Sequence, residues 1–135
     1  MQIVSGGIMS NILAIRAETK FTEDLNEMLQ ECGCDVTTVA DHAEAQKTVL
    51  GKRIQILVLE WGPNGNELSK ALISVVRKNH RTRRIHIIAV SENRTPEMLA
   101  EAMNATVNDY FSWPVSIYEL RSRLLWAANR FEQLV

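Results

Sequence analysis

The stretch ILVLEWGPNG, residues 56–65, joins the most apolar short run of the chain to a cluster of turn-forming residues. Four consecutive aliphatic residues at 56–59 are typical of a strand that is buried on both faces. The Gly-Pro-Asn-Gly segment that follows predicts a tight loop. We therefore expect residues 56–59 to form the central strand of a sheet, with a loop above its end.

Strand-like and helix-like segments alternate on both sides of this stretch. Short apolar or alternating runs predict four further strands, at residues 12–15, 36–40, 85–90 and 107–111. A helix is expected after each strand, and three helices have recognisable starts, at Asp41–Glu44, Thr95-Pro96 and Ser116–Glu119. Because parallel strands need crossover connections, five such units predict an α/β fold with helices on both faces of a parallel sheet.

The helices are expected to pack on this sheet through regularly spaced apolar residues. In the fourth helix the inward residues are predicted to be Leu99, Ala102 and Met103. In the long last helix the predicted buried stripe is Ile117, Leu120, Leu124, Ala128 and Phe131.

Length and composition limit the class of protein. A chain of 135 residues predicts one domain, which we place at residues 11–135, after a flexible lead or cloning remnant at 1–10. The net charge of -1 gives no overall attraction to nucleic acid, so we expect no such partner. No apolar run reaches the roughly 20 residues that cross a bilayer, and no signal-peptide pattern is present. We therefore expect a cytoplasmic protein without membrane contact.

Cys32 and Cys34 are separated by a single glycine. A structural zinc site needs four ligands, so this pair predicts no metal site. Two reduced thiols near a loop are the favoured interpretation, and a redox-sensing pair is the alternative.

Parallel sheets bind ligands outside the carboxyl ends of their strands, so the residues that end the predicted strands form the candidate site. These residues are Arg16, Ala17, Glu60, Trp61, Ser91, Glu92, Trp113 and Pro114.

Four blocks of the sequence resemble the receiver domains of bacterial two-component response regulators: ILAI at 12–15, ILVLEW at 56–61, IIAVS at 87–91 and DYFSWP at 109–114. The resemblance covers about residues 11–135 and implies a flavodoxin-like, doubly wound (βα)5 fold with strand order 2-1-3-4-5. It also implies a cis peptide bond between Trp113 and Pro114. In this family an aspartate ending the third strand accepts a phosphoryl group, an acidic pair ending the first strand helps to hold magnesium, and a lysine before the proline contacts the phosphoryl group.

The chain departs from the family at most of these positions. Arg16 and Ala17 stand in place of the acidic pair, Glu60 in place of the aspartate and Trp113 in place of the lysine, whereas Ser91 matches the family's serine or threonine. Without the carboxylates magnesium loses its ligands, and without the lysine the transferring phosphoryl group loses a neutralising charge. We therefore expect a degenerate phosphorylation pocket with no metal, no cofactor and no catalytic residue.

Two hypotheses concern the contents of this pocket. Arg16 is expected to pair with Glu60, since a guanidinium suits a carboxylate in two-point contact. Trp61 and Trp113 are expected near one mouth, either plugging the pocket or offering a stacking surface to a ligand. Alternatively, Glu60 is a solvated acid and Ser91 an ordinary strand-ending serine.

The resemblance also implies an interaction face on the fourth helix, fifth strand and fifth helix. Tyr110 matches an aromatic residue whose exposure reports the state of a receiver, and Leu125 and Trp126 lie off the buried stripe of the last helix. The expected partner is another protein or a fused output domain, and a homodimer through the last helix is an alternative. The basic segment 77–84 is interpreted as a solvated loop, with binding of a phosphate-rich partner as its alternative.

These observations predict an atypical receiver that signals by protein contact, independently of phosphorylation, and is not an enzyme. Two alternatives stay open at this point. One is a working phosphoreceiver that uses Glu60, and the other is a small-molecule or redox sensor.

Overall fold

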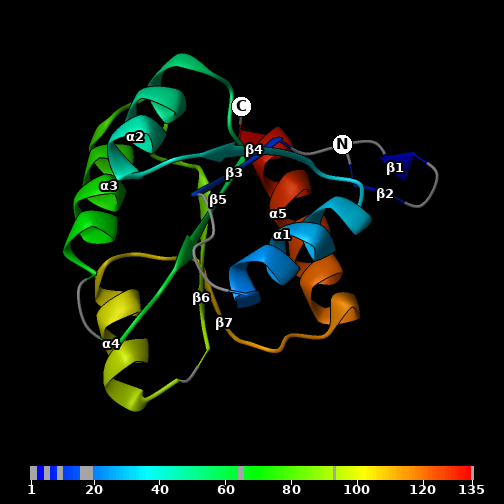
Figure 1. The fold of residues 1–135 in the computed structure, drawn as a ribbon. Coiled ribbons are helices and arrows are strands. Elements are labelled where there is room, and N and C mark those ends of the chain that lie inside the picture. Colours follow the sequence, from blue (N-terminus) through cyan, green and yellow to red (C-terminus); the bar gives the residue numbers. More distant parts are fainter. Residues whose placement is uncertain are drawn as a thin grey trace.

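The computed structural model describes residues 3–4, 7–8, 11–15, 20–63, 66–92 and 94–134. Its main sheet has five parallel strands: β3 (Asn11–Ile15), β4 (Asp35–Val39), β5 (Ile56–Glu60), β6 (His86–Ser91) and β7 (Asp109–Ser112). They lie side by side in the order β4-β3-β5-β6-β7 (Figure 1). This is the predicted flavodoxin-like order 2-1-3-4-5, and the stretch 56–60 forms the central strand.

Helices cover both faces of the sheet (Figure 1). They are α1 (Lys20–Glu31), α2 (His42–Gly51), α3 (Glu67–Lys78), α4 (Pro96–Asn104) and α5 (Ile117–Leu134). Helices α2, α3 and α4 pack on one face, whereas α1 and α5 pack on the other. No helix among the described residues is both long and apolar enough to span a membrane.

Side chains of β5 alternate between two buried clusters, as the geometry of a strand requires. Leu57 and Leu59 enter the α3-side cluster, which is built on helices α2, α3 and α4. Ile56 and Val58 enter the α5-side cluster, which is built on α1 and α5. Because β5 is central and buried on both faces, every one of its residues except Glu60 is apolar.

The local signals in the sequence explain where several helices begin and end. The Asp41 carboxylate accepts a hydrogen bond from the Glu44 backbone N–H at 2.8 Å, and the Thr95 hydroxyl accepts one from Met98 at 3.2 Å. After α1, Gly33 adopts a φ of 84°, which lets its N–H reach the Gln30 carbonyl at 2.9 Å.

The predicted helix faces need two corrections. In α4, Met103 is 44% exposed, and Met98 is buried in its place, one turn before the buried Ala102. Positions four residues apart share a helix face, whereas adjacent positions point about 100° apart. In α5, Leu120, Leu124 and Ala128 are buried as predicted, Ala127 is also buried, and Ile117 is only partly buried. The side chain of Phe131 lies outside the described residues.

Within residues 1–10, where no organised element was expected, β1 (Ile3–Val4) and β2 (Gly7–Ile8) pair antiparallel. The peptide bond between Trp113 and Pro114 is cis, as the family resemblance implied.

Candidate functional site

The carboxyl ends of β5, β6 and β7 bring three of the predicted site residues to one edge of the sheet. Glu60 pairs with Val90 in the register, and Ser91 pairs with Ser112 one step further along. The Trp113 N–H donates to the Ser91 carbonyl at 2.7 Å, which extends the ladder past the end of β7. Glu60, Ser91 and Trp113 therefore end neighbouring strands.

Two members of the predicted pocket cannot be placed. Arg16 and Ala17 lie outside the described residues, so the proposed pairing of Arg16 with Glu60 stays a prediction. The Glu60 side chain is exposed at the end of β5.

The described residues do not fit a magnesium ion. No group of three or more His, Cys, Asp or Glu gathers anywhere in the described part of the chain. Magnesium requires a near-octahedral set of oxygen ligands, usually with carboxylates among them. The exposed carboxylate of Glu60, with no group of three such ligands around it among the described residues, does not provide such a set.

Ser91 and Tyr110 form a buried pair of hydroxyls. The Ser91 side chain is fully buried, and its Oγ lies 2.7 Å from the Tyr110 hydroxyl. Tyr110 is partly buried against the α3-side cluster. Its ring lies 6.0 Å from the guanidinium carbon of Arg94, at the beginning of the loop that leads into α4. This hydrogen bond holds Tyr110 inward, against the end of the neighbouring strand.

Trp113 takes part in apolar packing. Its ring lies 6.0 Å from that of Phe21 at a tilted angle of 46°, and it packs against the α5-side cluster. The position at which receivers carry a lysine is thus occupied by an indole that contacts the first turn of α1.

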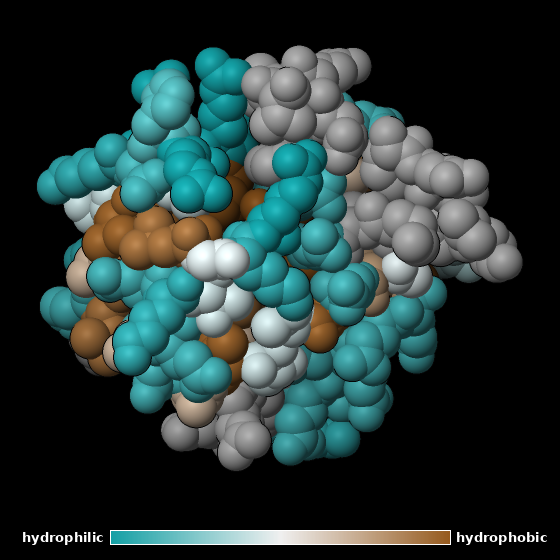
Figure 2. Space-filling model, turned by 90° about the horizontal axis from the view of Figure 1, so that it is seen from above, coloured by the Kyte–Doolittle hydropathy of each residue, from teal (hydrophilic) through white to brown (hydrophobic). Residues whose placement is uncertain are grey.

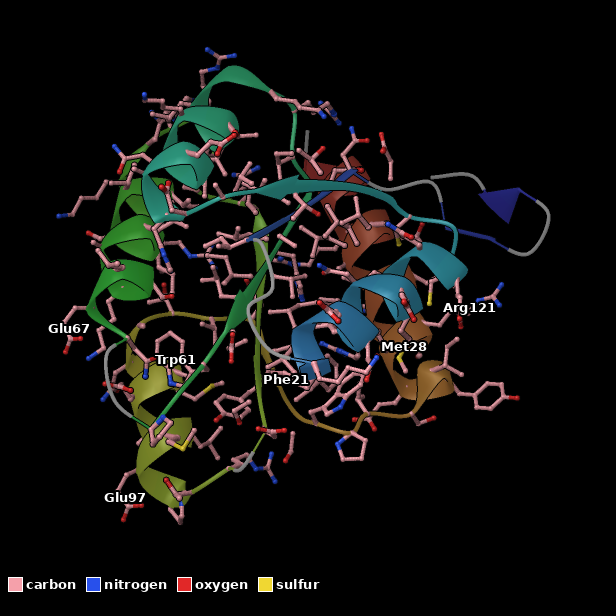
Figure 3. The ribbon with its side chains drawn as sticks, in the orientation of Figure 1. Phe21, Met28, Trp61, Glu67, Glu97 and Arg121 are labelled. Carbon is pink, nitrogen blue, oxygen red and sulfur yellow. The ribbon has the colours of Figure 1, made fainter. Side chains whose placement is uncertain are left out.

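The two tryptophans do not share one mouth, contrary to expectation. Trp61 is 1% exposed within the α3-side cluster, whereas Trp113 packs on the opposite face of the sheet. Figure 3 shows Trp61 near α4, well away from Phe21, the ring against which Trp113 packs. In the strand register Trp61 is level with Ser91 and Ser112, so Trp113 lies one position further along, where side chains point to the opposite face. A stacking platform made of both rings is therefore absent.

A polar network that sequence analysis did not find ties the loop after β5 to α4. The buried Asn66 side chain accepts a hydrogen bond from the Gly62 N–H at 3.0 Å and donates to the Gly62 carbonyl at 2.8 Å. It also donates to Glu101 Oε1 at 2.8 Å, and Lys70 Nζ lies 2.6 Å from Glu101 Oε2. Sequence analysis did not single out Asn66, because its partner Glu101 is 35 residues away.

These contacts also set the charge of Glu101. Hydrogen bonds from Lys70 and Asn66 lower the pKa of the Glu101 carboxyl. The nearby Trp61 indole is buried, and its Nε1 has no hydrogen-bond partner among the described residues. The network therefore keeps Glu101 ionised beside a buried ring.

A second cluster joins β6, β7 and α5 near the other end of the sheet. The buried His86 Nε2 lies 2.5 Å from Asp109 Oδ2, and Arg123 Nη2 lies 2.9 Å from Asp109 Oδ1. Burial alone would raise the pKa of Asp109, but the hydrogen bonds from His86 and Arg123 outweigh it and the pKa is lowered. The cluster pins α5 to the sheet.

The predicted interaction residues occupy different surroundings. Trp126 is 48% exposed, and the guanidinium carbons of Arg123 and Arg130 lie 4.8 Å and 5.7 Å from its ring centre. Leu125 is only partly buried and packs against the α5-side cluster, whereas Tyr110 packs against the α3-side cluster. Trp126 is thus the most exposed of the three.

Both cysteines are buried and free of a disulfide bond. Burial raises the pKa of Cys32, and it raises the pKa of Cys34 to about 12. Because the thiolate is the reactive form, these thiols have the character of small core residues.

In fold, the chain is similar to solved receiver domains. The receiver domain of the sensor histidine kinase PA1611 from Pseudomonas aeruginosa PAO1, with a magnesium ion coordinated in its active-site cleft, matches with 24% identity and a TM-score of 0.75. That match covers 90% of this chain and 99% of that chain. The receiver domain of the Francisella response regulator 1452 matches with 23% identity and a TM-score of 0.71, over 90% and 98% of the two chains.

A CheY-like receiver domain protein from Methanospirillum hungatei JF-1 matches with 17% identity and a TM-score of 0.72, over 95% of this chain and all of that one. No protein-family model and no curated protein matches the sequence. The fold of this chain is therefore that of the CheY-like receiver domains.

Proposed function

We propose that this chain is a pseudo-receiver, a non-enzymatic domain that works in cytoplasmic two-component-type signalling through protein contact and without a phosphorylation cycle. The observation that carries the proposal is the hydrogen bond of 2.7 Å between Ser91 and Tyr110. The family resemblance makes Tyr110 the reporter of state and places Ser91 in the phosphorylation pocket. A direct bond between the two holds the reporter inward without any phosphoryl group.

The surroundings of Glu60 support the same proposal. Phosphoryl transfer depends on positive groups that neutralise the charge spreading over the phosphoryl oxygens. Trp113, in the position of the family lysine, offers an uncharged ring that packs on Phe21. The extra methylene of a glutamate, relative to aspartate, also moves the attacking oxygen by about 1 Å, enough to impair the geometry.

The alternative of a redox or small-molecule sensor has less support. A redox sensor needs an accessible thiolate, and burial raises the pKa values of Cys32 and Cys34. A ligand stacked between Trp61 and Trp113 would need both rings on one side of the sheet.

Signalling by contact requires a surface that a partner can cover. Trp126 on α5 is the largest exposed ring on the face that receivers use, and Arg123 and Arg130 flank it. Aromatic and arginine side chains together are typical of binding hot spots. We propose that a partner protein or a fused output domain contacts α5 here, and a homodimer through α5 stays an alternative.

The experiment is a titration with magnesium and beryllofluoride, a mimic of the phosphoryl group, followed by amide NMR shifts and tryptophan fluorescence. We expect no saturable response from this protein. A matched variant that restores the family residues, Arg16→Asp, Ala17→Asp, Glu60→Asp and Trp113→Lys, is expected to respond, provided that its circular dichroism shows a folded domain. A saturable response of the unchanged protein, centred on residues 60, 91 and 113, would refute the proposal.

A further inference from the structure

A hollow of about 680 Å³ lies at the amino ends of the strands, opposite the candidate site. Its walls are the loop that leads from α2 to β5 and the loop that leads from α3 to β6, and we call it the basic cavity. Five Lys and Arg side chains line it: Lys52, Arg53, Arg81, Arg83 and Arg84. They are a third of the chain's 15 such residues, and none of the described lining residues is acidic. Like charges in one hollow repel each other, so this site favours an anion.

The wall formed by residues 79–85 is held in place from inside. Thr82 is buried and its hydroxyl donates to the Val76 carbonyl at 2.8 Å. The Arg77 guanidinium donates to the carbonyls of Arg83 at 2.9 Å and Ile85 at 2.7 Å. The two residues that flank the anchored Thr82, Arg81 and Arg83, are exposed. Their backbone is therefore fixed before any ligand arrives, which lowers the entropic cost of binding.

The opposite wall is also anchored. The Lys52 N–H donates to the Thr48 carbonyl at 2.9 Å, and the Asn11 side chain donates to the Arg53 carbonyl at 3.2 Å. The Lys52 ammonium donates to the Thr37 hydroxyl at 2.7 Å, which keeps this charge at the rim while the residue stays exposed.

The base of the basic cavity is apolar. Val49, Ile54 and Ile85 line it and are at most 3% exposed, and Leu50 at its rim is 40% exposed. Figure 2, which looks down on the upper end of the molecule as drawn in Figure 1, shows hydrophobic atoms between long hydrophilic side chains on this face. A cationic rim over an apolar base suits a ligand with both phosphates and an organic part, and the volume is within the range of small-molecule sites.

We propose that the basic cavity binds the polyphosphate group of a small molecule, such as a nucleoside triphosphate. The planar guanidinium groups of Arg81 and Arg83 match phosphate oxygens in two-point contacts. No Phe, Tyr or Trp is among the described lining residues, and the chain's net charge is -1, so a long nucleic acid gains little stacking and no attractive overall field. This proposal concerns the other end of the sheet and does not depend on the proposed pseudo-receiver function.

The test is calorimetric titration of the full chain with sodium ATP, tripolyphosphate and a single-stranded 12-mer oligonucleotide, in buffer of low ionic strength without magnesium. ATP is expected to bind saturably and to shift the amide NMR signals of residues 50–54 and 79–85. Arg81→Glu and Arg83→Glu are each expected to weaken binding about tenfold or more, because a charge-assisted hydrogen bond is lost. Arg121→Glu, an equal change of charge at an exposed position on α5 (Figure 3), is expected to leave the affinity unchanged.

The two small probes distinguish the source of the phosphate group. If ATP binds more tightly than tripolyphosphate, the ligand is a nucleotide whose base contacts the apolar part of the cavity. If the two affinities are equal, the ligand is inorganic polyphosphate. Three results would overturn the proposal: no saturable heat with either probe, equal weakening by Arg121→Glu, or tighter binding of the oligonucleotide than of both. Circular dichroism of each variant verifies that the substitutions at these exposed positions leave the fold intact.

Discussion

The two ends of the sheet hold their polar groups in opposite ways. At the carboxyl end, the Ser91 and Tyr110 hydroxyls satisfy each other and Trp113 packs on Phe21. At the amino end, exposed cations such as Arg81 and Arg83 line a hollow. Parallel α/β sheets generally bind ligands at their carboxyl ends, but here the concentration of positive charge is at the other end. The same fold can therefore place a site at either end of its sheet, and the side chains at each end determine where a ligand fits.

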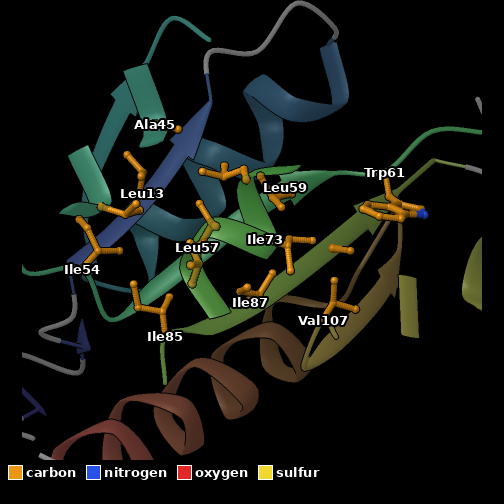
Figure 4. Packing of buried hydrophobic residues seen from close by; sticks show 14 of the residues in the cluster. Leu13, Ala45, Ile54, Leu57, Leu59, Trp61, Ile73, Ile85, Ile87 and Val107 are labelled. Atoms are coloured by element: carbon orange, nitrogen blue, oxygen red, sulfur yellow. The ribbon is translucent and has the colours of Figure 1, made fainter. Parts of the chain in front are cut away.

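Each end is also anchored by one polar side chain that reaches across elements. Asn66 joins the loop after β5 to α4 at the carboxyl end, and Arg77 joins α3 to the segments before β6 and β7 at the amino end. Figure 4 shows that the α3-side cluster connects the two ends, with Trp61 at one extreme and Ile54 and Ile85 toward the other. The following substitutions test how differently the two ends respond.

The largest effect is expected for Trp61→Ala at the carboxyl end. The ring is 1% exposed, so its removal leaves a cavity and should lower the free energy of unfolding by about 4 kcal/mol. Trp126→Ala, which removes a ring that is 48% exposed, should cost about 1 kcal/mol through its lost contacts with cations. Urea unfolding measures both values, and equal losses would contradict the packing described for Trp61.

A smaller loss is expected for Arg77→Met at the amino end. This substitution leaves the carbonyls of Arg83, Ile85 and Thr106 without the donor that Arg77 provides. It should lower the free energy of unfolding by about 2 kcal/mol. The neighbouring Lys78→Met, at an exposed position, should change stability by less than about 0.5 kcal/mol. If Arg77→Met is as mild as its neighbour in urea unfolding, the loop at 79–85 is not held by this guanidinium.

Tyr110→Phe at the carboxyl end should lower the free energy of unfolding by about 1 kcal/mol, because the buried Ser91 hydroxyl loses its partner. Tyr118→Phe is a matched control, since Tyr118 is 82% exposed. A double-mutant cycle with Ser91→Ala should give a coupling free energy of about the same size. Additive effects of the two substitutions would show that the pair does not hold Tyr110 inward.

The smallest effect concerns the acid sensitivity of the Asn66 network. Hydrogen bonds from Lys70 and Asn66 lower the pKa of Glu101 in the folded protein, so its stabilising contribution is complete above the unfolded pKa of about 4.3. That contribution is lost as the pH falls through the lower pKa of the folded state. Glu101→Gln should therefore reduce the loss of stability between about pH 5 and pH 3. Glu97→Gln, at an exposed position on the same helix, is the control, and identical pH profiles of the two variants would contradict this role.

Much of the fold followed from the order of residues along the chain. The run of aliphatic residues at 56–59 predicted a central strand because a strand buried on both faces has no polar side to display. Asp41 and Thr95 marked helix starts because their side chains accept hydrogen bonds from backbone N–H groups that every helix leaves unpaired. The strand order came from the resemblance to receivers. The inward face of α4 was predicted less well, since residues 98 and 103 are both methionine and only packing selects Met98 for burial.

Three features follow from the sequence alone: the alternation of strands and helices, the uncharged Trp113 at the lysine position, and the density of cations at residues 77–84. All three are local properties of the chain. Which of these cations stabilise the fold and which are exposed depends on the tertiary packing. It turned Arg77 inward to carbonyls more than five residues away, left Arg81 and Arg83 outside, and brought Lys52 from another loop to face them. Contacts between residues distant in sequence depend on how the elements pack, and a local sequence pattern does not predict that packing.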